Sequence, residues 1–413
     1  MSALRRALDA HLAREPEGEA VRWPEGSWTW RELAERVDAV RLEAGRTVVE
    51  ARIVTLLPAL VAAEAAGACL VPWDPRESAR PEGGEGFAGV VISTSGTSGA
   101  RRAARLPWTA LVASAQAVNQ ALDLRAGDAW LSALRLAHVG GVGVMLRCVL
   151  AGATMVLSER FSVEFAVAEL GRVTHASFVA RMLERVLEQG PETEGLRAVM
   201  VGGGPSAEGL LRRARAAGIP TVATYGLTEA CSTVTVQRPG DPVDGSAGRP
   251  LDGVSVRVVG EAIQVRGPTV FAGYDPPHEA RIEDGWLVTG DLGWMEGERL
   301  FVDARREDRI VTGGENVAPA RVEAVLAEFP GLDEVAVVGR PDPSWGQVVV
   351  AVVVWSGAPA LAALQAWAAE RLSPAERPRR WVQARGSLPR DAAGKLRRRT
   401  IRLPGESEVG GAG

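Results

Sequence analysis

The sequence predicts an α/β protein: a large N-terminal domain of α/β layers with a small β-barrel, followed by a smaller α+β domain at the C-terminus. Three observations predict it. A length of 413 residues is enough for two domains. Short apolar runs alternate with helix-period patterns through most of the chain. From about Asp244 to Val302 the pattern changes to shorter strands separated by glycine and proline, which is typical of a small barrel or curled sheet.

The alternating part contains three expected strands and three expected helices. Each strand is a short apolar run bounded by turn residues, and each helix has apolar residues at helical spacing. Strands that alternate with helices favour a parallel sheet with both faces covered. The strands are Ala153–Leu157, Ala198–Val201 and Pro220–Thr224, and the helices are Glu164–Leu170, Ala180–Glu188 and Ala207–Ala217.

A domain boundary is expected at the charged run Asp303–Asp308. We therefore divide the chain into residues 1–303 and residues 304–413. The second part has the pattern of a compact α+β unit. Its expected elements are the helix Pro319–Phe329, the strands Glu334–Val338 and Val348–Val354, and the helix Ala360–Arg371.

Composition narrows the class of protein. A formal net charge of −4 gives no basic footprint, which argues against a nucleic-acid partner. The longest apolar runs, such as Val348–Trp355, are too short to span a bilayer. Cys69, Cys148 and Cys231 fit no metal spacing and indicate buried thiols in a reducing compartment. The opening segment has no apolar core for secretion, so we expect a cytoplasmic protein.

The chain contains a single lysine among its 47 basic residues, Lys395, in the segment Pro389–Leu396. An ammonium is a compact, rotatable point charge that can enter an anionic site which the planar guanidinium does not match. The alternative is a drift toward arginine that left one lysine on a solvated surface. Because Lys395 follows the last expected helix, a functional role requires that its partner site be brought to it, which indicates a mobile domain.

Three motifs carry polar chemistry at the ends of expected strands. Ser93–Arg102 follows the apolar run Gly89–Ile92 and supplies hydroxyls and backbone amides suited to phosphate oxygens, without the spacing of a Walker loop. In Thr224–Glu229, an aromatic ring could stack on a base and a carboxylate could hold magnesium. Asp291, after Thr-Gly, could accept ribose hydroxyls. The structural alternatives are a surface loop, a core tyrosine before a helix cap, and a turn aspartate.

Together with Arg305, Gly313–Asn316 and Gly394–Lys395, these motifs occur in an order that resembles the adenylate-forming superfamily of acyl-CoA ligases, adenylation domains and luciferases. The resemblance covers nearly the whole chain. One branch is more similar, the o-succinylbenzoate–CoA ligases of menaquinone synthesis. The segments similar to that branch are Ala137–Arg147, Val173–Val179, Val201–Pro205 and Val311–Val317.

The resemblance implies a reaction in two halves. A carboxylate attacks the α-phosphorus of ATP and expels pyrophosphate, and the thiol of coenzyme A then attacks the acyl-adenylate. The first half depends mainly on positioning and fixed positive charge. The implied partners are therefore a small carboxylic acid, ATP and coenzyme A, with Mg²⁺ as the metal ion; a homodimer stays open.

The resemblance also assigns roles to residues. Lys395 would bridge the acid and the phosphate, with Thr228, Glu229 and His138 as further catalytic residues and Glu229 as the magnesium ligand. Asp291 and Arg305 would hold the ribose. The phosphate loop would contribute Thr94, Ser95, Gly96, Thr97, Ser98 and Gly99, and the adenine would contact Tyr225, Gly226, Gly203 and Gly204.

For the second half-reaction, the C-terminal domain would rotate about Glu307, so that Gly313 and Gly314 face the site and line the coenzyme A channel. A hairpin turn is the structural alternative for the two glycines, and both roles can hold at once.

For the acid, the resemblance and the chemistry together suggest Arg147, His175 and Gly202 as substrate residues. The ring carboxylate of o-succinylbenzoate needs a buried cation or several donors, and Arg147 is the candidate. The alternatives are a surface arginine on the expected helix Val142–Leu150, and satisfied core histidines for His138 and His175.

The sequence departs from the family in four places. The stretch between Pro72 and Gly89 is short, Arg102 stands where a lysine usually ends the phosphate loop, and Ala180-Arg181 replaces a Pro-Thr pair. In the fourth place, Arg321 stands where a glutamate usually follows Pro319, although Glu323 keeps the next acidic position. The acid therefore stays open: another aryl or acyl acid, or loading of a carrier protein, is the main alternative. A nucleotide-binding regulatory or scaffold protein without turnover is a third possibility, against which Lys395, Glu229 and Asp291 argue.

Overall fold

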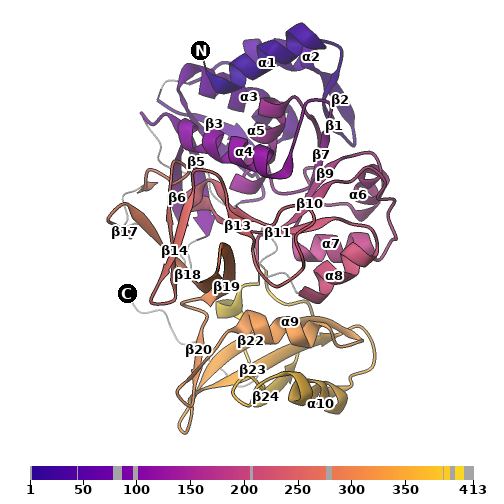
Figure 1. Ribbon diagram of the computed structural model, residues 1–413, viewed down its shortest axis with the longest axis vertical. Helices are drawn as coiled ribbons and strands as arrows, with labels where there is room; N and C mark the ends of the chain where they lie inside the picture. Colours follow the sequence, from indigo (N-terminus) through magenta and orange to yellow (C-terminus); the bar gives the residue numbers. More distant parts are fainter. Residues whose placement is uncertain are drawn as a thin grey trace. The chain divides into compact units, whose positions relative to one another are not determined.

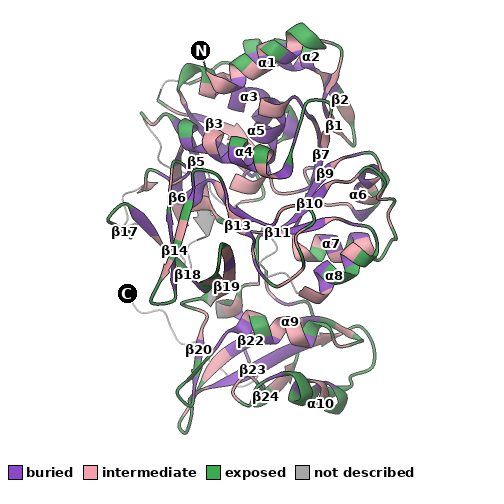
Figure 2. Ribbon diagram, in the orientation of Figure 1, coloured by how far each residue is buried: buried purple, intermediate pink, exposed green. Residues whose placement is uncertain are grey.

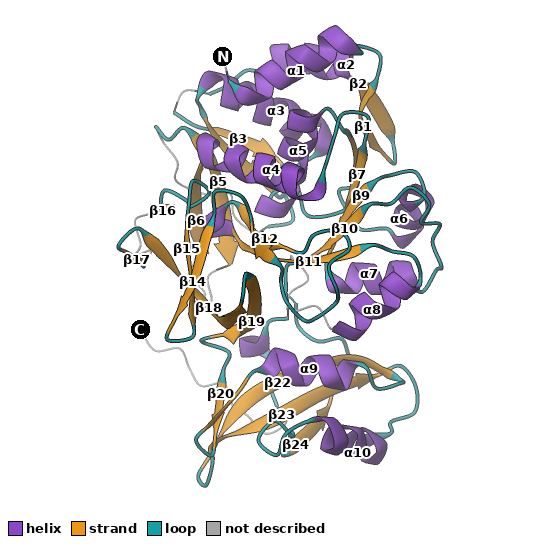
Figure 3. Cartoon of the chain, in the orientation of Figure 1, coloured by secondary structure: helices purple, strands orange, loops and turns teal. Residues whose placement is uncertain are grey.

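The computed structural model forms two compact units, Met1–Thr289 with Trp294–Phe301, and Gly290–Gly293 with Val302–Gly413 (Figures 1 and 3). Within the described ranges, no helix has both the length and the hydropathy that crossing a membrane requires. The described residues are 2–43, 45–77, 86–95, 101–204, 208–275, 281–384, 386–390 and 396–403.

The first unit is built on a nine-stranded sheet of order β13-β12-β11-β10-β9-β7-β8-β1-β2. The strands from β11 to β1 are parallel to their neighbours, as the alternating sequence pattern predicts. Strands β2, β12 and β13 add antiparallel edges. The bounds are β1 (Glu19–Trp23), β2 (Gly26–Thr29), β7 (Ala129–Ser132), β8 (Thr154–Leu157), β9 (His175–Phe178), β10 (Ala198–Val201), β11 (Thr221–Leu227), β12 (Ser232–Val236) and β13 (Arg249–Pro250).

A second sheet of the same unit has the order β16-β6-β5-β4-β3. Its strands β3, β4 and β5 are parallel, whereas β6 returns antiparallel to β5 and β16 pairs antiparallel with β6. The phosphate motif therefore begins within one arm of a hairpin. The bounds are β3 (Thr47–Glu50), β4 (Cys69–Trp73), β5 (Gly89–Ser95), β6 (Arg101–Pro107) and β16 (Tyr274–Asp275).

A third sheet occupies the region where the sequence predicts short β-strands. Its order is β14-β15-β18-β17, and β19 also pairs with β18. Alternate residues of β14 are exposed, so one face of this strand is turned to solvent. Four successive residues of β15 are buried, so both faces of that strand are covered. The bounds are β14 (Ser255–Val259), β15 (Ala262–Arg266), β17 (Ile282–Glu283), β18 (Trp286–Glu296) and β19 (Arg299–Arg305).

Apart from Arg147, helix α5 is apolar on every side, unlike an amphipathic surface helix, and its residues from Gly141 to Val149 are all buried (Figure 2). It ends at Gly152, whose φ of 75° is left-handed. A Cβ at Gly141 would come within 2.4 Å of the Arg135 carbonyl oxygen, so the helix start requires glycine. The helices of the first unit are α1 (Ala3–Arg14), α2 (Trp30–Ala39), α3 (Ile53–Ala66), α4 (Trp108–Leu122), α5 (Val139–Ala151), α6 (Val163–Leu170), α7 (Ala180–Leu187), α8 (Glu208–Ala216) and the 3₁₀ helix η1 (Thr228–Ala230).

The second unit has a sheet of order β21-β20-β23-β22, with β24 beside β23. Side chains of β22 and β23 alternate between two small cores: one is closed by α9 and α10, and the other by Leu388, Ile401 and Leu403 of the C-terminal segment. The bounds are β20 (Ile310–Thr312), β21 (Glu315–Val317), α9 (Pro319–Ala327), β22 (Leu332–Asp342), β23 (Gly346–Trp355), α10 (Leu361–Arg371), β24 (Arg380–Gln383) and the 3₁₀ helix η2 (Arg398–Thr400).

The difference from the sequence prediction that bears on the site concerns β11, which continues to Leu227 instead of ending at Thr224. Strand β12 pairs with it along this extension. A Cβ at Gly226 would lie 1.7 Å from the Ser232 carbonyl oxygen, so glycine is what permits the close approach of the two strands. Tyr225 and Gly226 therefore lie within a strand, and the motif does not follow the strand as predicted.

Candidate active site

Part of the predicted site lies outside the described residues, namely Gly96, Thr97, Ser98, Gly99 and Lys395. The backbone of Thr94 and Ser95 is described, at the end of β5. These two positions pair with Arg102 and Arg101 of β6, respectively. The structure thus shows that the phosphate motif connects two antiparallel strands.

The glycine run and the tyrosine motif meet at one edge of the nine-stranded sheet. Strands β10 and β11 are parallel neighbours, with Val201 opposite Ala223, so Gly202–Gly204 and Tyr225–Glu229 both lie at the carboxyl ends. A Cβ at Gly202 would come within 2.6 Å of the Thr224 side chain, and Gly203 has a φ of 83°. Carboxyl ends of parallel strands are where α/β sheets bind ligands.

Glu229 lies on η1 and is fastened to β16. Its Oε1 accepts a hydrogen bond of 2.6 Å from the hydroxyl of Tyr274, and its backbone oxygen accepts one of 2.9 Å from Phe271 N. Burial, followed by the neighbouring Glu229 carboxylate, raises the pKa of Tyr274, so its hydroxyl is protonated at neutral pH and donates this bond. Thr228 begins η1 and is half-buried.

The residues present fit one magnesium ion. The described residues contain no cluster of three or more His, Cys, Asp or Glu side chains that could hold a metal. Mg²⁺ is usually bound through one or two carboxylates together with substrate phosphates, and not by a cage of protein ligands. Glu229 supplies one such carboxylate, and the hairpin of β5 and β6 is the predicted site of the substrate phosphates.

Arg147 is a charged side chain that is buried in the first unit without a described counter-charge. It is only 2 % exposed, and its described partners are neutral: Nη2 donates to Thr233 Oγ1 at 3.2 Å and Nη1 lies 3.8 Å from the Met200 sulfur. The guanidinium carbon lies 5.5 Å from the Trp130 ring centroid. No described carboxylate pairs with it, and Nε has no hydrogen-bond partner.

Burial lowers the pKa of Arg147 to about 10, which still leaves it charged at neutral pH. The alternative of a surface arginine is therefore wrong. The physical reason is the all-apolar helix α5, which has no solvent-facing side on which the guanidinium could lie.

The two predicted histidines have different surroundings. His175 is fully buried; Nε2 lies 3.0 Å from the Leu122 carbonyl oxygen, Nδ1 lies 2.9 Å from Thr174 Oγ1, and the ring stacks on Trp130. Both ring nitrogens are thus satisfied inside the core, which favours the structural role over a substrate role. His138 is half-buried at the N-cap of α5, the helix that carries Arg147.

In the second unit, the predicted ribose residues are adjacent. Arg305 Nε lies 3.3 Å from Asp291 Oδ1, and Arg305 Nη1 lies 3.9 Å from Glu307 Oε1. Gly313 and Gly314 form the turn between β20 and β21, with φ values of 59° and 85°. A Cβ at Gly313 would come within 2.7 Å of the Trp345 ring, so the hairpin requires glycine there.

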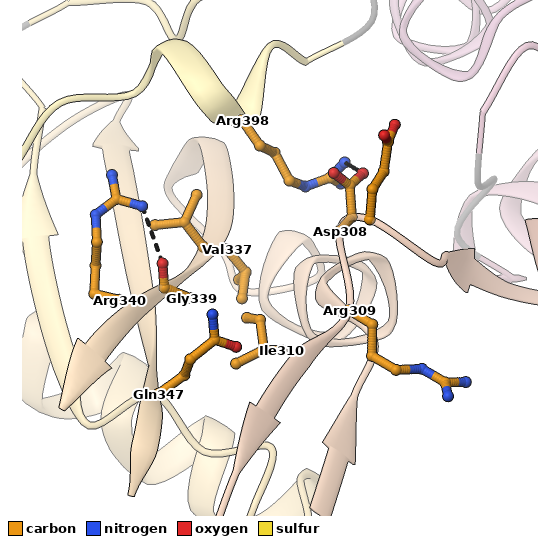
Figure 4. Close-up of a pocket in the computed structure, with 10 residues that line it drawn as sticks. Asp308, Arg309, Ile310, Val337, Gly339, Arg340, Gln347 and Arg398 are labelled. Carbon is orange, nitrogen blue, oxygen red and sulfur yellow. Dashed lines mark hydrogen bonds and ion pairs between the residues drawn. The ribbon is translucent and has the colours of Figure 1, made fainter. Parts of the chain in front are cut away.

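Arg398 holds the residue next to the predicted hinge. Its Nη1 donates to Asp308 at 3.0 Å, and its Nε donates to Glu323 of α9 at 3.1 Å. Arg398 reaches toward Asp308 (Figure 4). The two residues line a cavity of about 130 Å³, which is also lined by Glu307 and Gln347. Its lining contains none of the nucleotide motifs.

The segments on either side of Lys395 are described and are held to the second unit. Arg390 pairs with Leu396 as an isolated β-bridge, and Arg397 N donates to the Pro389 carbonyl oxygen at 2.8 Å. Arg390 also forms an ion pair of 2.9 Å with Glu334.

Sequence reasoning missed Tyr274 and Arg398. The signal for Tyr274 was that the chain has only two tyrosines, of which the other, Tyr225, is in a predicted motif. Arg398 carried no such signal, because arginine is abundant and its partners lie 75 and 90 residues away in the sequence.

Comparison with known proteins identifies both parts of the chain. Residues 88–275 match the AMP-binding enzyme family, and residues 321–395 match the AMP-binding enzyme C-terminal domain. A 2-succinylbenzoate–CoA ligase of Bacillus mycoides (strain KBAB4) is 38% identical over 337 residues, which are 76% of this chain and 69% of the relative. One of Listeria monocytogenes serotype 4b (strain F2365) is 34% identical over 326 residues, 76% of this chain and 70% of the relative.

Solved structures agree with this result. The o-succinylbenzoate CoA synthetase of Bacillus subtilis in complex with its acyl-adenylate intermediate superposes with a TM-score of 0.86 at 26% identity, over 99% of each chain. The same enzyme with ATP and a magnesium ion gives 0.81 at 27% identity, over 95% of this chain and 98% of that one. The chain therefore belongs to the AMP-binding family of adenylate-forming enzymes.

Proposed function

We propose that this enzyme is an ATP-dependent acid–CoA ligase that converts 2-succinylbenzoate, ATP and coenzyme A into 2-succinylbenzoyl-CoA, AMP and pyrophosphate. Two Bacillus relatives named 2-succinylbenzoate–CoA ligase each match 76% of the chain. The α/β fold with two units is also that of the enzyme whose complex contains the acyl-adenylate.

In the first half-reaction, a carboxylate oxygen of the acid forms a bond to the α-phosphorus, and the bond from that phosphorus to the departing pyrophosphate breaks. We assign Lys395 to the negative charge that collects between acid and phosphate, and the hairpin of β5 and β6 to the leaving oxygens. Glu229 would hold magnesium, which neutralises charge on the pyrophosphate when bound.

The nucleotide would lie at the carboxyl ends of β10 and β11. Tyr225 and the backbone of Gly203, Gly204 and Gly226 would contact the adenine, and the Asp291–Arg305 pair would take the ribose hydroxyls. In the second half-reaction, the coenzyme A sulfur bonds to the acyl carbon, its proton is lost, and AMP leaves. We assign Glu307 to the hinge between the halves, and Gly313 and Gly314 to the thiol channel.

One observation supports the choice of a diacid. Arg147 is a buried cation with neutral described partners, and burying a charge without a counter-charge costs several kcal/mol. In a substrate with two carboxylates, one would be activated by ATP and the other would pair with the positive charge of Arg147. 2-Succinylbenzoate has both: its succinyl group reacts and its ring carboxylate would pair with Arg147.

The experiment is pyrophosphate exchange with a panel of acids at saturating ATP and magnesium. We expect 2-succinylbenzoate to support exchange, and its analogue without the ring carboxylate to require a concentration about 30- to 150-fold higher, since a charge-assisted contact of this kind is worth roughly 2–3 kcal/mol. Faster exchange with a monoacid would favour another aryl or acyl acid. If none of the acids supports pyrophosphate exchange, the result would favour a nucleotide-binding protein without turnover.

We also propose a cytoplasmic location, because ATP and coenzyme A are cytoplasmic substrates and the three cysteines are free, buried thiols. Sedimentation of the purified enzyme distinguishes a monomer from a homodimer.

A further inference from the structure

The carboxylate proposed for magnesium has one of its two oxygens already engaged. Tyr274 donates its hydroxyl to Glu229 Oε1 at 2.6 Å, a short bond of the kind that an ionised acceptor makes. Among the residues that the structure describes, nothing donates to Oε2. The bond therefore fixes the rotation of the carboxylate and leaves one oxygen for a ligand.

Tyr274 is held firmly enough to act as a support. It pairs with Ala104 of β6, the strand that leaves the phosphate motif. The Phe271 ring meets its ring edge-on at a centroid distance of 4.9 Å, and the Arg102 guanidinium carbon lies 5.7 Å from the ring centroid. The same short segment is tied to Glu229 by the Phe271 backbone amide. The strand of the phosphate hairpin and the metal ligand thus share one support.

We infer that Tyr274 is a positioning residue for Glu229: its hydroxyl sets the orientation in which this carboxylate receives the magnesium ion that accompanies ATP. The inference rests on the proposed function only for the metal-binding role of Glu229. Groups that orient a ligand from behind commonly change metal affinity by about 10- to 100-fold when they are removed.

The test is the magnesium dependence of ATP binding, measured by titration calorimetry on the full chain without any acid. Tyr274→Phe removes one oxygen atom and keeps the ring packing. We expect the magnesium concentration for half-maximal ATP binding to rise about tenfold. Binding of ATP without magnesium should stay at the wild-type value, which a general loss of structure would not allow.

Two further variants make the result specific. Glu229→Gln should raise the magnesium midpoint by itself, and adding Tyr274→Phe to it should change the midpoint no further, because the two residues act through one carboxylate. Tyr225→Phe removes the other tyrosine hydroxyl and should alter ATP affinity equally at every magnesium concentration. An unchanged midpoint in Tyr274→Phe, or an equal shift in the Glu229→Gln background, would overturn the inference.

These outcomes are separable from the proposed activity, because the titration contains no acid. If no acid supports pyrophosphate exchange but the magnesium midpoint still shifts in Tyr274→Phe, the choice of reaction is wrong and the role of Tyr274 stands. If exchange proceeds and the midpoint does not move, the reaction stands and the role of Tyr274 is wrong.

Discussion

Two arginines, one in each unit, have opposite surroundings. Arg398 donates to two carboxylates, Asp308 and Glu323, and it is 19 % exposed. Arg147 is almost fully buried, and its described partners are a threonine hydroxyl and a methionine sulfur. Two carboxylates lie beside the single positive charge of Arg398. No described carboxylate lies beside that of Arg147.

The difference indicates what each charge does. A buried cation with its acids in place closes a network and belongs to the architecture. A buried cation without an acid reduces stability, and such a cost persists where a ligand makes use of it. Arg398 is therefore part of the fold, whereas Arg147 is the cation that we propose pairs with a carboxylate of the substrate.

The largest expected effect is on the rate of adenylation. It tests Lys395, which, like Arg147, we propose binds a substrate group and not a carboxylate of the protein. Lys395→Ala should slow adenylation by roughly 100- to 1,000-fold, the loss seen when one donor to a developing charge is removed. Thioester formation from supplied acyl-adenylate should fall by less than about tenfold, because that half does not form the same charge. Rapid-quench assays of the two halves measure this, and equal losses would contradict the assignment.

The next effect concerns the paired arginine. Arg398→Ala leaves two acids without their cation and should lower the free energy of unfolding of the second unit by about 3 kcal/mol. Urea unfolding followed by tryptophan fluorescence measures it. Arg321→Ala is the matched control: it removes an exposed arginine of α9 from its pair with Glu376 and should cost less than about 1 kcal/mol. Equal costs for both variants would remove the distinction.

Arg147, whose described partners are neutral, should behave in the opposite way. Arg147→Met keeps an unbranched side chain and removes a charge that lacks a described acid, so the free energy of unfolding should stay level or rise. Affinity for 2-succinylbenzoate should fall about 100-fold, with ATP affinity unchanged. Calorimetry and urea unfolding give the two values. A stability loss as large as that of Arg398→Ala would show that Arg147 is structural.

The smallest effect concerns an acid between two arginines. Burial alone would raise the pKa of Asp74, but hydrogen bonds from Arg76 and Arg135 outweigh it and hold that pKa well below its ordinary value. A carboxyl whose folded pKa is lowered stabilises the fold above its unfolded pKa, near 3.9, and loses this contribution as the pH falls.

Asp74→Asn should therefore cost about 2 kcal/mol at pH 7 and progressively less below about pH 4. Thermal unfolding of both proteins across this range measures the difference. A cost that does not change between pH 7 and pH 3 would rule out the ionised carboxylate as the cause.

Much of this architecture could be predicted from the sequence. The apolar runs at 198–201 and 153–157 are strands within one residue of their predicted bounds, because buried parallel strands are short apolar segments between turns. The motif Tyr225–Glu229 could be identified from its residue types and its place at a strand end, whereas Gly202–Gly204 was identified through the family resemblance; glycine at such an end allows a backbone to approach a ligand. The family resemblance on these motifs is confirmed by the comparisons.

What the sequence could not predict depends on partners far along the chain. The Tyr274–Glu229 bond joins residues 45 positions apart, and the Arg398 network joins three separate segments. The burial of Arg147 was within reach, because the helix around it is apolar on every side, but a lone arginine on a helix is usually a surface residue. The roles of Lys395 and of Glu307 as the hinge stay predictions.

The scarcity of tyrosine has a practical consequence. The chain holds two, Tyr225 and Tyr274, and one lies in the predicted adenine motif while the other touches the predicted metal ligand. Biosynthetic replacement of tyrosine by 3-fluorotyrosine would place a fluorine label at these two positions and nowhere else. The ¹⁹F spectrum would then contain one resonance for the nucleotide and one for the cation, so the order in which the two arrive could be followed without any further labelling.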